Sequence, residues 1–431
     1  MIEISGKYTN ATVMIDYVDE NCIAQIIRMI NHPAFVNPVV IMPDTHSGEG
    51  SVIGFTMKMG EKLIANIVGV DIACALLSYN IGKIKLNHKE LDDKIREKIP
   101  FGMNIRKKLH LNFEREINWS SNTKIQYSWE RFVSLCKRIQ IDPMYAQQSV
   151  GTLGSGNHFI ELGISEKTGD TWVTVHSGSR NLGKKICEYW QDVAFKKDVP
   201  DIKVMIEIIK NNSKPQEIEK RINVIKEEMK QYKKSDLDWI DGEDKQGYIE
   251  DMKFASWYAS LNRTYIMHTI IESINNEELN KRMLRSNEQI PWIESIHNYI
   301  DFQDNIIRKG AIRSYIGERM VIPFNMRDGI LICGGKSNPD WNFSAPHGAG
   351  RVYSRSKAKA ELNLEKFEKD MDGIFSTSVG KGTIDECPDA YKDSKIIEEA
   401  IQPTAIVLDR IVPIHNMKDI SDEKPWKKKG K

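Results

Sequence analysis

The sequence lacks a long apolar run, and this shortage excludes a membrane-spanning helix. The longest nearly apolar run extends from Leu63 to Leu77, and Asn66 and Asp71 interrupt it, whereas a membrane helix needs about 20 apolar residues. The start, MIEISGKYTN, does not combine a basic region with an apolar one, as a secretory signal would. We therefore expect a chain without membrane segments.

Cysteine is scarce, and neither sign of charge dominates. The six cysteines include no CxxC pair, which is typical of free thiols in a reducing cytosol, so we expect a cytoplasmic protein. Lysine and arginine number 61 against 60 for aspartate and glutamate, a net charge of +1. Because no overall basic excess attracts nucleic acid, contact with RNA or DNA would need a local patch. With 28% charged and 40% hydrophobic residues, a disordered chain is excluded.

Short runs rich in β-branched residues, bounded by glycine, proline and aspartate, indicate strands. They include VNPVVIMP, SVIGFTMKMG, HFIELG and TWVTVHSGS, and strand signals return at 312–334. Helix formers dominate from about 184 to 270 and again from about 351 to 370. We see no internal repeat and no linker long enough to separate domains. The sequence therefore predicts an α+β fold of one domain over residues 1–431, with a sheet-rich core, surrounding helices and a helical insertion at about 184–270.

One helix of the predicted insertion has a clear apolar period. Five apolar residues recur at intervals of three and four, which places them on one helical face: Ile218, Ile222, Ile225, Met229 and Tyr232. The segment Ser213-Lys-Pro-Gln216 predicts a capping box with an early proline at its start. The charges between the apolar residues predict a solvated face rather than an RNA-binding surface. The polar residues 419–431 predict a flexible tail.

Metal-capable side chains stand at the ends of predicted strands, in glycine-rich surroundings. They are Asp71 and Cys74 in GVDIAC, His158 in GTLGSGNHFIEL, His176 in TWVTVHSGSR and His297 in IESIHNYI. The spacing of three residues can turn Asp71 and Cys74 to one side, offering a carboxylate and a thiolate to a cation. Singly, each residue is also typical of a buried core side chain. Together they predict a divalent-metal site, but the sequence does not show which ligands share an ion.

A second chemical segment, SAPHGAGRVYSRS, sets His347 before Gly348, Ala349 and Gly350, with Arg351 after them. Small residues leave backbone N–H groups open to a phosphate, and the helix-like residues that follow would add an N-terminal dipole. Arginine can form two parallel hydrogen bonds to phosphate oxygens. In such a cradle His347 is a ligand, a general acid or a nucleophile that forms a phosphoramidate. The alternative is a glycine hinge beside a hydrogen-bonded histidine.

Two weaker signals complete the set. MPDTHSGEGSVIG is a glycine-rich acidic loop that contains Asp44 and His46. RKGAIR contains Arg308 and Lys309, a compact basic spot suited to phosphate.

Together these segments resemble the RtcB family of RNA-splicing ligases. The matching pieces are PDTHSGEGSVIG, GVDIAC, GTLGSGNHFIE, HSGSR, DMKFASWYASLNR, HNY, RKGA, SAPHGAGRVYSR and DECPDAYKD, in the family's order across about residues 43–393. The resemblance implies an RtcB-like fold and an enzyme that uses GTP and two manganese ions. Such an enzyme joins RNA ends bearing a 2′,3′-cyclic phosphate or 3′-phosphate to 5′-hydroxyl ends, in RNA repair or tRNA splicing. Its partners would be RNA with broken ends and an archease-like activator.

The resemblance also implies roles for individual residues. Cys74 would bridge the two ions, with Asp71, His158, His176 and His297 completing their shells, and His347 would carry GMP as a covalent adduct. The nucleotide site would comprise Asn157, Phe159, Glu161, Asn298, His347, Gly348, Ala349, Gly350, Tyr391 and Lys418. RNA phosphates would contact Arg180, Arg308, Lys309 and Arg351. Asp44 would activate the 5′-hydroxyl or hold a water.

The chain departs from the family pattern at three places. Asn181 stands where a glycine is usual, Pro323-Phe-Asn-Met326 replaces a Pro-Gly-Ser-Met segment, and the chain continues beyond Lys418, the match to a C-terminal lysine that reads guanine. These departures suggest a divergent branch, devoted to repair of cleaved RNA.

Two other functions remain open at this stage. A metal-dependent RNA phosphoesterase or cyclic-phosphate hydrolase would need the metals but no nucleophilic His347, and a non-catalytic RNA-end-binding protein would need no turnover at all. Thiolate and imidazole also favour zinc over manganese, so the ion that the purified protein holds is a separate question.

Overall fold

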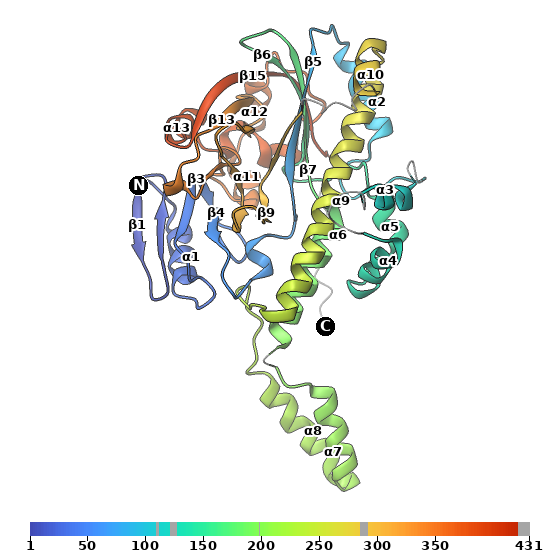
Figure 1. Ribbon diagram of the computed structural model, residues 1–431, viewed down its shortest axis with the longest axis vertical. Helices are drawn as coiled ribbons and strands as arrows, with labels where there is room; N and C mark the ends of the chain where they lie inside the picture. The colour runs from blue at the N-terminus through green and yellow to red at the C-terminus, as the bar shows by residue number, and fades with distance from the viewer. Residues whose placement is uncertain (109–111, 121–126, 198, 285–291, 421–431) are drawn as a thin grey trace.

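The computed structural model describes residues 1–108, 112–120, 127–197, 199–284 and 292–420. Two large sheets and helices on their flanks confirm the predicted α+β class (Figure 1). Almost all of the predicted tail at 419–431 lies outside the described residues. None of the helices in the described ranges is long and apolar enough to cross a membrane.

The strands form two large sheets and a small one. The six-stranded sheet has the order β1 (Ile2–Ser5), β2 (Asn10–Val13), β3 (Val39–His46), β4 (Ile53–Lys58), β10 (Ile306–Lys309) and β9 (Asn298–Asp301). The seven-stranded sheet has the order β12 (Arg319–Pro323), β13 (Ile330–Gly335), β15 (Ala405–Met417), β6 (Phe159–Ser165), β7 (Thr171–Ser177), β5 (Ala75–Gly82) and β8 (Ile293–Ile296). The pair β11 (Ala311–Arg313) and β14 (Ser344–Pro346) contacts both large sheets, β11 through β8 and β4 and β14 through β3.

Helices cover the sheets and bury their apolar sides. They are α1 (Glu20–Ile30), α2 (His88–Lys98), α3 (Phe113–Ser120), α4 (Trp129–Arg138), α5 (Pro143–Gln148), α6 (Arg180–Lys196), α7 (Ile202–Asn212), α8 (Pro215–Met229), α9 (Gly242–Ile274), α10 (Glu277–Leu284), α11 (Arg355–Glu361), α12 (Leu364–Asp370) and α13 (Ser394–Ala400). Four short 3₁₀ helices span Ala65–Ile67, Pro339–Trp341, Lys381–Glu386 and Pro388–Ala390. The largest buried apolar cluster joins α1, α4, α6 and α9 to the six-stranded sheet.

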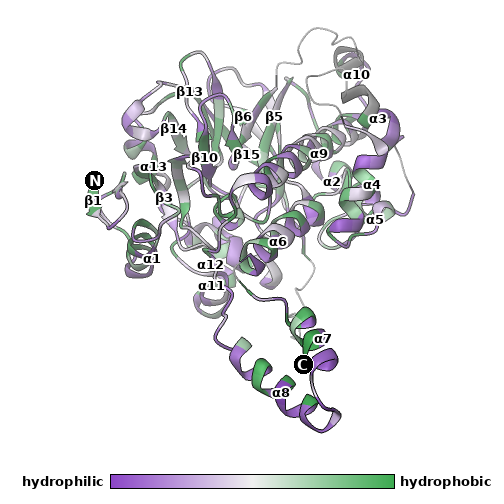
Figure 2. Ribbon diagram, turned by 60° about the horizontal axis from the view of Figure 1, so that its bottom comes forward, coloured by the Kyte–Doolittle hydropathy of each residue, from purple (hydrophilic) through white to green (hydrophobic). Residues whose placement is uncertain are grey.

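The helices between residues 180 and 274 differ in position: α6 and α9 pack against the body of the protein, whereas α7 and α8 project from it. The long helix α9 runs along the seven-stranded sheet, contacts β5 and β7, and packs against α6 (Figure 1). By contrast, α7 and α8 contact one another and project as a hairpin away from the body, with polar and apolar residues alternating along both (Figures 1 and 2). The apolar residues predicted to share one face of α8 are half-buried, whereas the charges between them are exposed.

Two local predictions about helix ends are wrong. The capping box at 213–216 is absent from the described hairpin, because α8 begins at Pro215 and its N-cap Lys214 makes no capping hydrogen bond through its side chain, although the early proline is confirmed. The helix expected over 351–370 is two short helices, and the first begins only at Arg355, after the N-cap Ser354. The predicted helix dipole therefore does not follow directly on the small residues after His347.

Candidate functional site

Four neighbouring strands bring all five predicted metal ligands to one edge of the seven-stranded sheet. His176 lies in β7 and pairs with Phe159, so that His158 immediately precedes β6 at the same edge. Ala75 in β5 pairs with Ile296 in β8, which places Cys74 opposite His297, and the backbone N–H of His297 donates to Cys74 O at 3.0 Å. Asp71 lies in the turn before β5.

The ligand atoms form two groups that share one thiol. Sγ of Cys74 lies with nitrogen atoms of His176 and His297 in the first group, and with Asp71 and His158 in the second. Within each group the atoms lie within 4.8 Å of one another. The arrangement suits two cations that share a thiolate, because thiolate, imidazole and carboxylate are all metal ligands.

The hydrogen bond on the far side of the His158 ring directs its inner nitrogen towards Asp71. Nδ1 lies 2.9 Å from the carbonyl oxygen of Leu153, and since a carbonyl only accepts, Nδ1 carries the proton. Nε2, the other ring nitrogen, lies 2.9 Å from Asp71 Oδ2. Two acceptors at this distance require a proton or a metal ion between them.

The same reasoning applies to His176 in the other group, whereas Nδ1 of His297 is buried without a partner in the described ranges. Nδ1 of His176 donates to the carbonyl oxygen of Asn157 at 3.1 Å, so Nε2 has a lone pair directed inwards. That atom lies 3.2 Å from Cys74 Sγ and 3.4 Å from His297 Nε2. The residues present therefore fit a cation bound between two imidazoles and a thiolate.

Burial makes these groups poor at holding charge unless an ion is bound. Burial raises the pKa of Cys74 well above its usual value, and neighbouring Asp71 raises it further. Burial lowers the pKa of His176 and of His297 well below the usual value, and nearby imidazoles add to the effect. Burial opposes ionisation of Asp71 too, but His158 holds its pKa at about 2. A bound metal would reverse the effect at Cys74, because metal coordination deprotonates a thiol.

Helix α9 braces the turns that carry the ligands. Arg263 is fully buried, and its Nη1 donates to Ala73 O at 2.8 Å and to Ser177 O at 3.0 Å. The neighbouring Asn262 accepts from the backbone N–H groups of Gly151 and Thr152. Both residues belong to the matching segment DMKFASWYASLNR, but their role follows only from the structure, because α9 is remote in sequence from these turns.

His347 stands beside this cluster and is oriented by Asp44. The His347 ring lies 4.8 Å from the ring of His297, and its Nδ1 lies 2.7 Å from Asp44 Oδ2. Asp44 is completely buried at the end of β3. The carboxylate of Asp44 accepts the Nδ1 proton of His347 through Oδ2, whereas its Oδ1 is buried without a partner in the described ranges, and its predicted role in activating a hydroxyl or holding a water stays a prediction. Nε2 is left with its lone pair available.

The small residues after His347 let this loop approach β3 closely. Gly350 has a φ of +77°, and a Cβ there would lie 2.1 Å from the carbonyl oxygen of Asp44. Gly350 therefore serves close packing against Asp44, which keeps His347 in register with its partner. Gly348 and Ala349 line the cavity beside His347.

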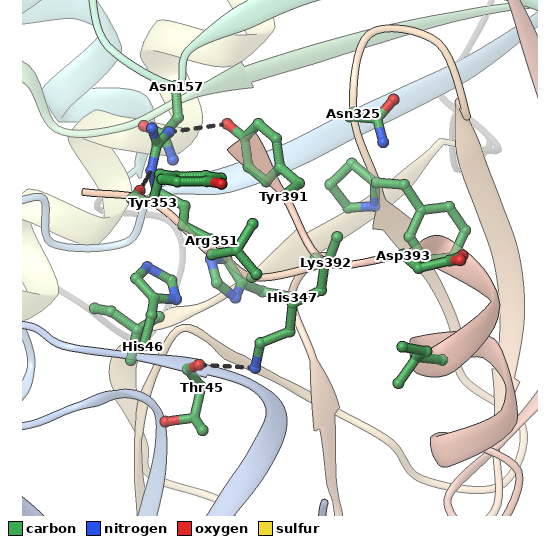
Figure 3. A pocket seen from close by; sticks show the side chains of 18 of the residues that line it. Thr45, His46, Asn157, Asn325, His347, Arg351, Tyr353, Tyr391, Lys392 and Asp393 are labelled. Atoms are coloured by element: carbon green, nitrogen blue, oxygen red, sulfur yellow. Dashed lines mark hydrogen bonds between the residues drawn. The ribbon is translucent and has the colours of Figure 1, made fainter. Parts of the chain in front are cut away.

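A single large cavity joins His347 to a second group of predicted residues. It has a volume of about 1570 Å³ and is lined by His347, His176, Asn157, Phe159, Glu161, Tyr391 and Lys418 among others. Figure 3 shows His347 between His46 and Lys392, whose ammonium donates to Thr45 O at 2.9 Å. The volume exceeds the roughly 300–1,000 Å³ of a small-molecule pocket, so a nucleotide leaves room for a second ligand.

In the lining of the cavity, Glu161 and Asn416 carry buried oxygen atoms without a hydrogen-bond partner. Nδ2 of Asn416 donates to Glu161 Oε2 at 2.8 Å. Glu161 Oε1 and Asn416 Oδ1 are buried and find no partner within the described ranges. Burial raises the pKa of Glu161 to about 8, although Asn416 and Lys418 pull it down. The pair presents acceptors to a ligand that carries N–H donors.

Lys418 lies in the same cavity lining, and its ammonium forms an ion pair with Glu386. Its Nζ lies 3.0 Å from Glu386 Oε2, and 5.4 Å from the ring centre of Phe159. Tyr391 donates to the same Glu386 at 2.6 Å. Burial alone would raise the pKa of Glu386, but Lys418 and two arginines hold it at about 2. The structure thus places Lys418 beside the other predicted nucleotide residues, although the chain continues beyond it.

The divergent segment Pro323–Met326 also lines the cavity. Oδ1 of Asn325 accepts from the backbone N–H groups of Arg327 and Asp328, at 3.0 and 2.9 Å. Asn325 thereby closes its own turn, and its side-chain oxygen is already used.

Two of the four arginines and lysines predicted to bind RNA phosphates are buried and paired, which corrects that prediction. Arg308 is 0% exposed and forms ion pairs with Asp301 and Asp304. Nζ of Lys309 donates to carbonyl oxygens, including that of Asn66 at 2.9 Å, and burial lowers its pKa to about 8. Both side chains stabilise the loops around the site. From the sequence alone, a buried pair of basic residues in a strand looks the same as a solvent-facing pair, because the groups that neutralise it lie elsewhere in the chain.

The other predicted phosphate and RNA residues differ in accessibility. Arg180 is half-buried, with Nε on Thr152 and Nη2 on Gly102 O, and Arg351 pairs with Glu386 at 3.1 Å. Asn298 is engaged in structure, because its amide donates to Asp71 O and accepts from Gly310 N–H. By contrast, Asn157 is exposed at the cavity wall.

Several residues of the site were not singled out from the sequence. They are Asn416, Glu386 and Lys392, which line the cavity, and the bracing residues of α9. Period-two alternation could have identified Asn416, because residues two apart at the end of a strand share a face, here with Lys418. Glu386 and Lys392 belong to the matching segment DECPDAYKD, but nothing in it distinguished them from Asp385 or Asp389.

Fold and site together define a class: an α+β protein whose sheet edge carries two candidate cation sites beside an aspartate-oriented histidine, in a cavity large enough for a nucleotide. The family described as tRNA-splicing ligase RtcB matches residues 25–419, and the chain belongs to this family. The resemblance seen in the motifs is thus confirmed.

Relatives in bacteria and archaea agree with this membership. The RNA-splicing ligase RtcB of Escherichia coli (strain K12) is 26% identical, over 87% of this chain and 88% of that protein. The tRNA-splicing ligases RtcB of Nanoarchaeum equitans and Methanococcus maripaludis are 26% and 25% identical, over 86% and 94% of this chain and 85% and 93% of those proteins. Identities near one quarter over nearly the whole length agree with a divergent branch of a family of RNA-splicing ligases.

Proposed function

We propose that the protein is a GTP- and manganese-dependent RNA ligase that joins 2′,3′-cyclic phosphate or 3′-phosphate ends to 5′-hydroxyl ends. The observation that carries the proposal is the hydrogen bond of 2.7 Å between Asp44 and Nδ1 of His347, beside the cysteine–histidine cluster. The same orientation also suits a metal ligand, but His347 belongs to neither of the two groups of candidate ligands. The bond also suits a nucleophile, because it places one ring proton on Nδ1 and fixes the direction of Nε2.

The first chemical step is GMP transfer to His347. Nε2 attacks the α-phosphorus of GTP, a bond forms between nitrogen and phosphorus, and the bond to the β-phosphate oxygen breaks, so that pyrophosphate leaves. Asp44 stabilises the positive charge that develops on the imidazole, as its buried carboxylate lies on the opposite nitrogen.

Two further steps complete ligation. An oxygen of the RNA 3′-phosphate attacks the α-phosphorus of the adduct, and the bond to Nε2 breaks, which regenerates His347. The 5′-hydroxyl of the second strand then attacks the RNA 3′-phosphorus, loses its proton and displaces GMP. A 2′,3′-cyclic end first needs water to open it to a 3′-phosphate.

Two cations would be held at the sheet edge, one by Asp71, Cys74 and His158 and the other by Cys74, His176 and His297. When bound, they would neutralise charge on the phosphoryl groups and fix the triphosphate in line with Nε2. The thiolate and imidazole donors bind zinc more tightly than manganese, so the ion found on purification and the ion that supports turnover need not be the same.

The far end of the cavity suits guanine. The free oxygen of Glu161 accepts from N–H donors at the base edge, Lys418 donates to the base oxygen, and Phe159 and Tyr391 enclose the ring. Asn157 and Arg180 remain the residues for the RNA ends, which the excess volume of the cavity accommodates. The reaction would serve RNA repair or tRNA splicing, with or without an archease-like activator.

The test is intact-mass measurement after incubation with GTP and manganese, for the wild type beside His347→Ala. The expected result is a covalent GMP adduct on the wild type alone, followed by ligation of RNA with 3′-phosphate and 5′-hydroxyl ends. Absence of the adduct, with metals demonstrably bound, would exclude the ligase mechanism. Cyclic-phosphate hydrolysis that survives in His347→Ala without any ligation by the wild type would indicate a hydrolase instead.

A further inference from the structure

A buried polar cluster outside the cavity holds the main chain of Lys418. Oγ of Ser378 accepts from the backbone N–H of Lys418 at 2.8 Å and donates to its carbonyl oxygen at 3.1 Å. Nη2 of Arg96 donates to the same Oγ at 2.8 Å. The Ser378 hydroxyl thus uses its single proton and both lone pairs. Two of its three hydrogen bonds hold the backbone of Lys418, and the third connects the hydroxyl to Arg96.

Helix α2 supplies the support behind this hydroxyl. Asp92 is buried, and its Oδ2 accepts from Arg96 Nε at 2.8 Å and from Thr377 Oγ1 at 2.9 Å. Its Oδ1 lies 3.2 Å from Nε2 of His415 on β15. Asp92 and Arg96 are four residues apart on one face of α2, so the helix sets both groups at once.

The cluster fixes a position that the sheet itself does not fix. Strand β15 ends at Met417, and its last pairing is Met417 with Ile160. Lys418 therefore lies just beyond the ladder, and its flexible stem would carry the ammonium to many places if the backbone moved. Held by Ser378, the ammonium reaches Glu386 at 3.0 Å and lies over Phe159.

We propose that Asp92, Arg96 and Ser378 form a positioning clamp for Lys418 that sets the preference of the cavity for guanine over adenine. The inference rests on the proposed function and names residues that act on the nucleotide only through Lys418. Guanine presents the acceptor O6 where adenine presents the N6 amino donor. When the Lys418 ammonium is fixed, it can donate to O6 of guanine, whereas it repels the N6 amino group of adenine. When it is displaced, it no longer distinguishes the two bases.

The experiment measures equilibrium dissociation constants for α,β-methylene analogues of GTP and ATP, which cannot transfer a nucleotide to His347. We compare the wild type with Ser378→Ala, Ser378→Thr and Lys94→Ala, the last on the exposed side of α2. Ser378→Ala is expected to raise the Kd of the GTP analogue about tenfold, because a buried hydrogen-bond partner is lost. The Kd of the ATP analogue should change less than about twofold by the same reasoning, since adenine offers Lys418 no acceptor. Ser378→Thr keeps the hydroxyl and should restore the preference, and Lys94→Ala should behave as the wild type.

Three outcomes overturn the clamp. Unchanged affinities in Ser378→Ala would show that Lys418 needs no such support. An equal loss for both analogues together with weaker manganese binding would show a general structural effect. If Ser378→Ala does not fold, Arg96→Lys provides the test. This variant keeps the charge but loses the guanidinium Nη2 that donates to Ser378. Arg96→Lys must lower the guanine preference, or the clamp is rejected. A wild type without guanine preference would reject the proposed nucleotide site itself, whereas a wild-type preference that Ser378→Ala retains rejects the clamp alone.

Discussion

Two parts of the site differ in how they bury charge: the candidate metal cluster beside the cavity, here called the metal end, and the proposed guanine end, which comprises Glu161, Asn416, Lys418 and Glu386 in the cavity lining. At the metal end, Nε2 of His158 lies 2.9 Å from the carboxylate of Asp71 and the Nε2 atoms of His176 and His297 lie 3.4 Å apart, so that possible ligand atoms converge around the thiol of Cys74. At the guanine end, Lys418 and Glu386 neutralise each other at 3.0 Å. One end is incomplete without a cation, and the other has already paired its full charges.

Substitutions should therefore have larger effects at the metal end than at the proposed guanine end. At the metal end, the side chains would all coordinate a bound ion. Removal of one of them should abolish function, because the remaining groups have no other partner. An end whose charges are paired internally tolerates changes better and discriminates ligands through a few free atoms, here Glu161 Oε1 and Asn416 Oδ1 among the described residues. The predictions below follow this gradient.

Cys74→Ala should have the largest effect, because both candidate cation sites share its thiol. We expect loss of at least one bound ion and a decrease of about 1,000-fold or more in GMP transfer, since a metal can supply several kcal/mol to the transition state. Elemental analysis and single-turnover adduct formation measure the two effects. Cys136→Ala, at a buried thiol away from the cavity, is the matched control. Retention of both ions in Cys74→Ala would contradict a shared thiolate.

Asp44→Asn should follow, with metal binding intact. An amide at this position no longer fixes the proton on Nδ1 of His347, so the nucleophilic nitrogen is protonated in part of the molecules. Adduct formation should fall about 100- to 10,000-fold, as for other catalytic histidines that lose their orienting carboxylate. The rate at saturating GTP is the measurement, beside metal content. An unchanged rate would mean that Asp44 serves only the packing of β3.

Glu161 should make nucleotide binding depend on pH. Its pKa is about 8 in the protein without nucleotide, so the carboxyl is mostly protonated below pH 8, whereas the base edge needs an ionised acceptor. Affinity for the non-transferable GTP analogue should therefore rise as pH rises towards 8, by up to about tenfold per unit. Glu161→Gln should bind the analogue more weakly and without this dependence. Equal pH profiles for the two proteins would remove Glu161 from guanine recognition.

Sequence reasoning succeeded where chemistry is local and failed where it depends on distant partners. The five predicted metal ligands and His347 stand in or beside glycine-rich turns at strand ends, and the fold brings them together. Arg308 and Lys309 were misjudged, because Asp301, Asp304 and the carbonyl of Asn66 that neutralise them appear only in the fold. The capping box before α8 failed for a similar reason. The segment turns there between two paired helices, so Ser213 ends α7 and does not begin α8.

Asn325→Ala should have the smallest effect, although Asn325 lies in the segment that departs most from the family pattern. Its Oδ1 accepts from two backbone N–H groups of its own turn, and its Nδ2 donates to Asp328 at 2.8 Å. The side chain is thus occupied, and its removal should cost about 1 kcal/mol of local stability and change the Kd of the GTP analogue less than about threefold. Calorimetric binding and thermal unfolding measure both, with Asp328→Asn as a control that keeps the shape of the turn. A tenfold loss of guanine affinity without loss of stability would show that Asn325 turns to the base when nucleotide binds. Asn325 at the guanine end would then find its partner only in the bound nucleotide, just as the side chains of the metal end find theirs only in a bound ion.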